Sequence, residues 1–297
     1  MAICYYNGKY APMAECSLPV TDLVIQRGVG TFETIRIYEG RTFAMAQHLE
    51  RLAGSTEGAG IKAGAIIAKL PEIIREGLAR PEIKGYDGVV KPYITGGDVN
   101  DNGTFPHPRF FVVFDENIHK PTADEMKNGI ALEPNRVARP YPLIKSTNYL
   151  FGFIPLAKTS KTNFESLYIT PEGEITEAMS SNFFLCKDGK IITAPVGRVL
   201  KGVTRDIILT LARENGFTVE ERCPREEELA QADEAFITGS VKEILPVVRV
   251  GSQKIGAGRP RPRVQRLQHI FLQNMPKWWI NNEVRNHRTT NTRIRKR

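Results

Sequence analysis

The sequence predicts an α+β fold in two domains: a small N-terminal α/β domain and a larger C-terminal domain with mixed sheets in a pseudo-barrel. Strand-like segments cluster along the chain with helices inserted irregularly, so the strict alternation of a doubly wound fold is absent. A polar segment with a proline, 116–125, divides the chain. The 297 residues, 41% of them hydrophobic, suffice for two compact cores.

The N-terminal domain is expected over residues 1–118. Asn7-Gly8 supplies the positive φ angles of a tight turn and predicts a hairpin over 5–10. Apolar residues recur at helical spacing over 63–79, where Pro71 predicts a kink or a break. The remaining expected elements are a strand over 31–38, a helix over 45–53, and strands over 89–95 and 110–114 on either side of a polar loop at 96–107.

After a linker at 119–124, the C-terminal domain is expected over residues 125–275. Its strongest helix covers 204–215 and stops at Gly216, a typical C-terminal cap. Further helices are expected over 148–158 and 264–272. Alternating apolar runs predict strands over 130–137, 166–170, 182–186, 191–194, 217–221, 234–238 and 246–250.

The net charge of +8 is mostly a property of the last residues. Segment 276–297 holds seven basic residues and one acid, which is +6, so the other 275 residues carry only +2. The segment contains both tryptophans, Trp278 and Trp279, and lacks helical periodicity. It is therefore predicted to be a disordered basic tail, with a nucleic-acid-binding arm as the alternative interpretation.

Composition also excludes several classes of protein. No apolar run is long enough to cross a membrane, and the N-terminus lacks the pattern of a secretion signal. The four cysteines lie far apart, which fits reduced thiols in a cytoplasm. The five histidines are scattered, and no cluster of ligand side chains predicts a metal site.

Lys145 is the first candidate for catalysis. It follows the apolar residues 142–144 and precedes small and polar ones. An ammonium among apolar neighbours loses hydration, so its pKa falls and its amine becomes nucleophilic. Such a lysine can form a Schiff base with an aldehyde cofactor, although a surface lysine with a buried stem is the common alternative.

Three segments further along the chain support the interpretation of the Lys145 segment. Glu177 stands among small residues between two strand-like runs. Residues 202–204, Gly-Val-Thr, open a helix whose free N–H groups and dipole favour a phosphate. Residues 238–240, Thr-Gly-Ser, form another small, hydroxyl-bearing turn after a strand.

Together, the four segments resemble the fold-type IV family of pyridoxal phosphate enzymes, which includes branched-chain and D-amino-acid aminotransferases and aminodeoxychorismate lyase. The resemblance runs from about residue 3 to about residue 275, with the segments in family order. Residues 30–36, Gly-Thr-Phe-Glu-Thr-Ile-Arg, and 48–52, His-Leu-Glu-Arg-Leu, also look like family segments.

The resemblance implies a role for each matching residue. Lys145 would bind pyridoxal 5'-phosphate covalently and then move a proton at the substrate α-carbon, so it is the expected catalytic residue. Glu177 would pair with the pyridine nitrogen and keep it protonated, and Tyr149 would bond the phenolic oxygen. One cation, two residues of a helix N-terminus and one hydroxyl would hold the phosphate: Arg51, Val203, Thr204 and Ser240.

The substrate site resembles the family less closely. Lys91 stands where branched-chain members have an arginine, the tyrosine that precedes it there is missing, and the 96–107 loop lacks the arginine and histidine of the better-known D-amino-acid enzymes. Arg27 stands where branched-chain members have a tyrosine that reaches the neighbouring subunit's pocket. We expect Arg27 and Lys91 to bind the substrate carboxylate, with a loop ion pair as the alternative for Arg27. Phe32 and Val241 are expected to line the side-chain pocket, with a place in the core as the alternative for Phe32.

The sequence therefore predicts a ping-pong transaminase for an amino acid and a 2-oxo acid. The incomplete branched-chain pattern favours a D-amino-acid enzyme over a branched-chain L-amino-acid aminotransferase, and the lyase is the third reading. The resemblance also implies a homodimer with residues of both subunits in each site. Arg205 and Asp206 are expected to be structural, as an ion pair or as helix-end support.

Overall fold

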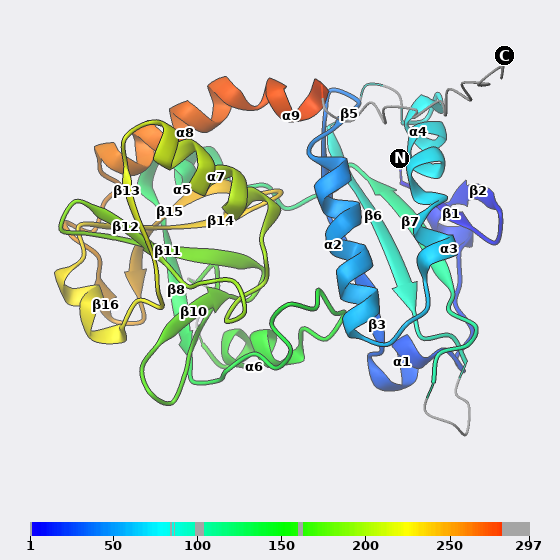
Figure 1. The fold of residues 1–297 in the computed structure, drawn as a ribbon, viewed down its shortest axis with the longest axis horizontal. Helices are drawn as coiled ribbons and strands as arrows, with labels where there is room; N and C mark the ends of the chain where they lie inside the picture. The colour runs from blue at the N-terminus through cyan, green and yellow to red at the C-terminus, as the bar shows by residue number, and fades with distance from the viewer. Residues whose placement is uncertain (1, 84, 86, 99–103, 160–162, 281–297) are drawn as a thin grey trace, which may run out of the picture.

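The computed structural model describes residues 2–83, 85, 87–98, 104–159 and 163–280 and forms two sheets side by side (Figure 1). In the described chain, the N-terminal sheet has seven antiparallel strands in the order β2-β1-β7-β6-β4-β5, and β3 also pairs with β6. Its strands are β1 (Ile3–Tyr6), β2 (Lys9–Pro12), β3 (Gly30–Phe32), β4 (Ile35–Tyr38), β5 (Arg41–Thr42), β6 (Gly88–Thr95) and β7 (Phe110–Asp115).

Helices cover this sheet and share its core. The helical elements here are η1 (Met13–Glu15), α1 (Leu23–Arg27), α2 (Met45–Gly58), α3 (Gly64–Ile67) and α4 (Leu70–Ala79). Leu52 of α2 and Ile74 of α4 are fully buried in one cluster with Val90 and Phe114 of the sheet. This apolar contact fixes α2, and with it Arg51, against the N-terminal sheet.

Two expected elements of this half are interrupted. The strand expected over 31–38 divides into β3 and β4, because Glu33 turns inward to an arginine and a histidine of α2. The helix expected over 63–79 divides into α3 and α4, with Pro71 in the first turn of α4 as its missing N–H requires. The hairpin turn at Asn7 and Gly8, with φ of 50° and 80°, confirms the Asn-Gly prediction.

The C-terminal sheet has nine strands in the described chain and closes into a barrel. Its order is β10-β9-β8-β15-β14-β11-β12-β13, and an additional β10–β11 pairing joins the ends of the first six strands. The β8–β9, β8–β15 and β12–β13 pairs are parallel, so the sheet is mixed as predicted. The strands are β8 (Ile130–Asn135), β9 (Glu165–Ile169), β10 (Ile175–Ala178), β11 (Ser181–Lys187), β12 (Lys190–Thr193), β13 (Thr218–Glu221), β14 (Glu234–Gly239), β15 (Glu243–Val250) and β16 (Gln253–Lys254).

Successive residues of the barrel strands enter different cores. Phe183 and Leu185 belong to one apolar cluster, whereas Phe184 and Cys186 belong to the cluster formed with α7 and α8. This alternation is the period of two that a strand buried on both faces must have. The helical elements of this half are α5 (Ala123–Asn128), α6 (Leu150–Lys158), α7 (Val203–Glu214), η2 (Glu226–Gln231), α8 (Pro262–Asn274) and α9 (Pro276–Ile280).

The start of the expected tail is ordered, which corrects the prediction of disorder for that part. Residues 276–280 form α9 at the end of the coloured chain, beside β5 of the other half (Figure 1). The Trp279 ring lies 6.0 Å from that of Tyr38, and the Trp278 ring lies 6.3 Å from that of Phe43. Apolar burial of two indoles outweighs the absence of helical periodicity here, and residues 281–297 lie outside the described chain.

Two further helices were not expected. α1 is opened by Asp22, whose side chain accepts the N–H of Val24, and α5 by a capping box of Thr122 and Glu125. α5 begins within the segment expected to be a linker, and the domain limits at 118 and 125 remain a prediction. No helix of the described residues is long and apolar enough to span a membrane, and they hold no group of side chains suited to a metal ion.

Candidate active site

A recess between the two sheets collects the residues that were expected to hold a cofactor. Its walls come from α2, the segment before α6, the β10–β11 hairpin, the start of α7 and the end of β14. All of the expected cofactor residues line it: Arg51, Lys145, Tyr149, Glu177, Val203, Thr204 and Ser240. The fold therefore brings together segments that stand as much as 189 residues apart, from 51 to 240.

Lys145 is held by both halves of the chain. Its N–H donates to Ser55 Oγ of α2 at 3.1 Å, and its carbonyl accepts the N–H of Phe32 at 3.1 Å. The Nζ atom lies 4.6 Å from the centre of the Phe32 ring. Burial lowers the pKa of Lys145, and the charge of Arg51 lowers it further, to about 8. The neutral, nucleophilic amine is therefore far more abundant near neutral pH than it is for an ordinary lysine.

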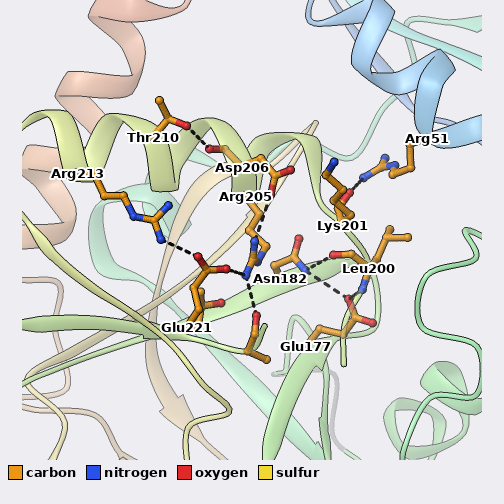
Figure 2. Close-up of polar contacts among 12 residues, drawn as sticks. Arg51, Glu177, Asn182, Leu200, Lys201, Arg205, Asp206, Thr210, Arg213 and Glu221 are labelled. Atoms are coloured by element: carbon orange, nitrogen blue, oxygen red, sulfur yellow. Dashed lines mark hydrogen bonds and ion pairs between the residues drawn. The ribbon is translucent and has the colours of Figure 1, made fainter. Parts of the chain in front are cut away.

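Glu177 lies on β10 with 4% of its surface exposed, and three donors surround its carboxylate. Oε2 accepts the Leu200 N–H at 3.0 Å and Asn182 Nδ2 at 3.4 Å (Figure 2). Oε1 accepts Arg139 Nε at 2.8 Å. Burial raises the pKa of Glu177, and the charge of Arg139 opposes that rise.

Arg51 is fixed by a buried acid. Its Nε and Nη2 atoms donate to the two oxygens of Glu33, both at 2.7 Å, and Nη1 donates to the Lys201 carbonyl at 2.9 Å (Figure 2). His48 Nδ1 lies 2.7 Å from Glu33 Oε2. Burial raises the pKa of Glu33, but Arg51 and His48 outweigh burial and hold that pKa far below its usual range. The guanidinium is thus presented to the recess in one orientation.

The start of α7 forms the opposite wall. Gly202 precedes the helix, and within the described chain no side chain caps its first turn. A Cβ atom at Gly202 would stand 1.9 Å from Asn182 Oδ1 and would displace that side chain, so glycine permits this approach. Behind the turn, Arg205 bonds Asp206 at 3.1 Å and Glu221 at 2.8 Å, which confirms the expected ion pair (Figure 2). The uncapped first turn thus borders the recess through Gly202, Val203 and Thr204.

A second, more apolar pocket adjoins the first on the side of Lys145 and Tyr149. Phe32, Lys91 and Val241, three of the four residues expected to contact the substrate, line this outer pocket. Arg27 does not: it is an exposed residue at the end of α1, and its Nη1 donates to the Gln26 carbonyl at 3.1 Å. Contact between Arg27 and a substrate therefore stays a prediction, and that contact would require the pocket of a second subunit.

Sequence reasoning missed four residues that shape the site. Arg139 contacts Glu177, and Lys242 lines the outer pocket while its Nζ donates to the buried Glu165 at 2.9 Å. Glu33 and His48 stand in segments noted for their family likeness, but no local pattern reveals that they bind Arg51.

Comparison with known proteins agrees with this geometry. Residues 30–250 match the family model of class IV amino-transferases. The D-alanine aminotransferase of Bacillus licheniformis is 31% identical over 274 residues, which cover 91% of this chain and 95% of that protein. A putative branched-chain-amino-acid aminotransferase of Methanocaldococcus jannaschii is 28% identical over 286 residues, 93% of this chain and 97% of that protein.

The chain belongs to the class IV aminotransferase family. The branched-chain amino acid aminotransferase of Escherichia coli has a similar structure, with a TM-score of 0.77, 25% identity, and coverage of 92% of this chain and 94% of that one. A 4-amino-4-deoxychorismate lyase of Pseudomonas aeruginosa shares the fold, with a TM-score of 0.79 at 23% identity over 92% of this chain and 99% of that one. Enzymes of the class IV aminotransferase family use pyridoxal phosphate, so the recess is the place to test for it.

Proposed function

We propose that this class IV aminotransferase binds pyridoxal 5'-phosphate through Lys145 and moves an amino group from an amino acid to a 2-oxo acid in two half-reactions. The observation that carries the proposal is the Lys145 amine, with a pKa lowered to about 8, in one recess with Glu177 and the start of α7. A nucleophilic amine, an acid for a ring nitrogen and a phosphate site are what such a cofactor requires.

The phosphate end of the recess fits the cofactor in three respects. The N–H groups that open α7 lack a side-chain cap in the described residues, and such groups favour an anion. Thr238 Oγ1 is buried beside them without a hydrogen-bond partner in the described structure. Arg51, with Nε and Nη2 bonded to Glu33, retains hydrogens on Nη1 and Nη2 that can bind a phosphate oxygen.

Each residue near the reacting atoms has a distinct task. Bound pyridoxal phosphate supplies an electron sink for the charge that develops when the substrate loses its α-proton. Lys145 would hold the cofactor through its aldehyde carbon and would move the α-proton of the substrate, for which a pKa near neutrality is suited. Glu177 would hold a proton at the cofactor's ring nitrogen. Tyr149 would donate its hydroxyl hydrogen to the cofactor's phenolic oxygen, because burial raises the pKa of Tyr149 to about 12 and keeps that hydrogen in place.

The preferred amino donor is proposed to be a D-amino acid. The 31% identity with a D-alanine aminotransferase supports this choice, and so does the lysine at position 91, where the branched-chain pattern has an arginine. The E. coli branched-chain enzyme, at 25% identity, supports L-amino acids of that class as the alternative donors. Lyase activity is the third reading, and the Pseudomonas aeruginosa lyase supports it through the fold alone.

The working enzyme is proposed to be a homodimer of the cytoplasm. Six large apolar side chains are exposed within one segment: Tyr141, Leu143, Leu150, Phe151, Phe153 and Ile154. A patch of this kind on a folded chain favours a protein partner, and a second copy would also bring its Arg27 near the outer pocket. The four cysteines are free, which suits a reducing compartment. A nucleic-acid-binding tail, the rival reading, concerns residues that lie mostly outside the described chain.

Two measurements test the proposal. Borohydride reduction of the protein with pyridoxal phosphate, followed by digestion and mass spectrometry, should place one phosphopyridoxyl group on the Lys145 peptide. The reduced protein from Lys145→Ala should carry no such group. A wild-type Lys145 peptide of unmodified mass would overturn the assignment.

The donor class follows from absorbance changes of the loaded enzyme with D-alanine, with L-leucine and with a chiral aromatic amine, each tested alone. Return of the original spectrum on adding 2-oxoglutarate or pyruvate completes the second half-reaction. A response to L-leucine without one to D-alanine would favour the branched-chain alternative, and release of pyruvate from aminodeoxychorismate would favour the lyase.

A further inference from the structure

The turn between β14 and β15 contributes to both halves of the site. Gly239 pairs with Glu243 at the end of the two antiparallel strands, so three residues span the turn. Its first residue, Ser240, lines the recess and the outer pocket, and its second, Val241, lines the outer pocket. The position of this turn therefore sets the shape of both pockets at once.

Glu243 has an unusual backbone conformation for its residue type. Its φ angle is 54°, in the left-handed region. A residue that closes a hairpin turn commonly has such a conformation, and glycine is the default there because it has no Cβ atom. A glutamate at this place carries a steric penalty that glycine would avoid. Some interaction of its side chain should therefore offset that penalty.

That interaction crosses to the other sheet. Tyr38 Oη of β4 donates to Glu243 Oε1 at 2.7 Å, over a sequence separation of 205 residues. Burial and the neighbouring Glu243 raise the pKa of Tyr38 far above its usual range, so the hydroxyl keeps its proton and remains a donor. Tyr38 is itself held in place by the rings of Phe43 and Trp279, at 6.1 Å and 6.0 Å.

Lys242, the residue before Glu243, bonds the turn to the C-terminal sheet. Lys242 Nζ donates to Glu165 Oε1 at 2.9 Å, to Ser180 Oγ at 2.6 Å and to Ser181 Oγ at 2.8 Å. These acceptors belong to β9, to the β10–β11 turn and to β11. Lys242 thus binds the turn to the barrel, whereas Glu243 binds it to the N-terminal sheet.

We propose that the Tyr38–Glu243 hydrogen bond is a latch between the two sheets that fixes the Ser240–Val241 turn in the geometry that the phosphate and the substrate require. Tyr38 lines neither pocket, so it is a positioning residue that acts through Glu243. The roles of Ser240 and Val241 in this inference rest on the proposed function, whereas the effect of the latch on the turn does not.

The first test removes one hydroxyl and leaves the ring. Tyr38→Phe should speed amide hydrogen exchange in the peptide that spans 238–244 of the chain without cofactor. It should also weaken the binding of pyridoxal phosphate about tenfold, because a hydrogen bond to a charged group is lost. Tyr10→Phe is the matched control: its hydroxyl donates to the Ile73 carbonyl at 2.6 Å within the N-terminal half, and both measurements should stay as in wild type.

A second pair of variants tests the partner. Glu243→Gln keeps an oxygen that can accept the hydrogen bond from Tyr38. Its rate of amide hydrogen exchange in 238–244 should therefore stay within about threefold of the wild-type rate, because a neutral acceptor is somewhat weaker than a charged one. Glu243→Gly suits the φ angle but loses the acceptor, so exchange should be fast although the fold is retained. If Tyr38→Phe fails to fold, the comparison of Glu243→Gln with Glu243→Gly decides whether the latch exists.

The latch and the proposed cofactor can fail separately. Unchanged exchange in 238–244 for Tyr38→Phe and for Glu243→Gly would overturn the latch, whatever the wild type binds. If the wild type binds pyridoxal phosphate, faster exchange in Tyr38→Phe with an unchanged affinity for pyridoxal phosphate would overturn the role of the latch in positioning. A wild type that binds no pyridoxal phosphate would instead overturn the proposed function, and the exchange result would still decide the latch.

Discussion

Arg139 Nε lies 2.8 Å from Glu177 Oε1, so a guanidinium shares the buried carboxylate that is proposed to face the cofactor's ring nitrogen. The same guanidinium donates to the carbonyls of Pro142 and, at 3.3 Å, of Ile144, which immediately precedes Lys145. One arginine therefore joins the acid and the lysine segment into a single unit. Its charge also opposes the effect of burial on Glu177.

Replacing this arginine should change the ionisation of Glu177. In Arg139→Gln, the Glu177 pKa should rise further above its usual range, because burial acts without the nearby cation. Infrared titration of the chain without cofactor, as a difference against Glu177→Gln, measures that pKa. Arg136→Gln is the control, since Arg136 is an exposed partner of Glu226. Equal titration curves for Arg139→Gln and wild type would contradict the prediction.

The rate at which the chain captures pyridoxal phosphate should depend on pH through Lys145. The neutral amine is the nucleophile, so the rate should rise as pH rises and level off above a midpoint at about 8. Stopped-flow absorbance of the chain without cofactor measures this profile. A rate that continues to rise towards the ordinary lysine pKa of 10.5 would show that burial does not shift the amine.

Arg27→Ala should raise the Michaelis constants for the amino acid and the 2-oxo acid about 10- to 100-fold, because a charge-assisted bond to the carboxylate is lost. Steady-state kinetics with both substrates check this. Arg75→Ala is a matched control, since Arg75 is also exposed and also bonds a nearby carbonyl, that of Pro71 at 3.2 Å. Constants that barely move in Arg27→Ala would leave this arginine outside the substrate site.

The exposed apolar segment should form the dimer interface. Leu150 lies on α6 and is 63% exposed. The variant Leu150→Arg would place a charge in that interface, so it should be a monomer in size-exclusion chromatography with light scattering. Leu272→Arg, at a leucine 54% exposed on α8, should leave the dimer intact. A monomeric wild type, or a dimer that survives the first change, would refute this interface.

The end of the chain should contribute to stability only as far as α9. A chain that ends at residue 280 should unfold like the full chain, whereas one that ends at residue 275 should lose about 2–3 kcal/mol, because Trp278 and Trp279 are half-buried on Tyr38 and Phe43. Urea unfolding compares the two. The chain that ends at 280 should keep transaminase activity, and any salt-sensitive binding of nucleic acid should be lost with residues 281–297.

The residues proposed to hold the cofactor could be selected from the sequence because each lies in a short local pattern. Lys145, Glu177 and Thr204 are recognisable from their neighbours, and the fold brings all three to one recess. Residues that act at a distance have no such pattern. Arg139 meets Glu177 across 38 residues and Lys242 meets Glu165 across 77, and a single sequence gives no measure of such contacts.

Errors in the expected elements have the same origin. The strand over 31–38 breaks at Glu33 because an ion pair with Arg51 outweighs the local preference for extended backbone. The tryptophans near the end of the chain pack on rings at positions 38 and 43, which no periodicity within 276–297 can reveal. Both cases are tertiary contacts that override local propensity.

The position of α9 also has a consequence for biosynthesis. A domain at the start of a chain generally folds while the ribosome is still at work. Here, the indoles that cover Tyr38 and Phe43 belong to Trp279 and Trp278, which are added 241 and 235 residues later. The first half must therefore emerge with that aromatic surface bare, and the surface is covered only after α9 has been synthesised.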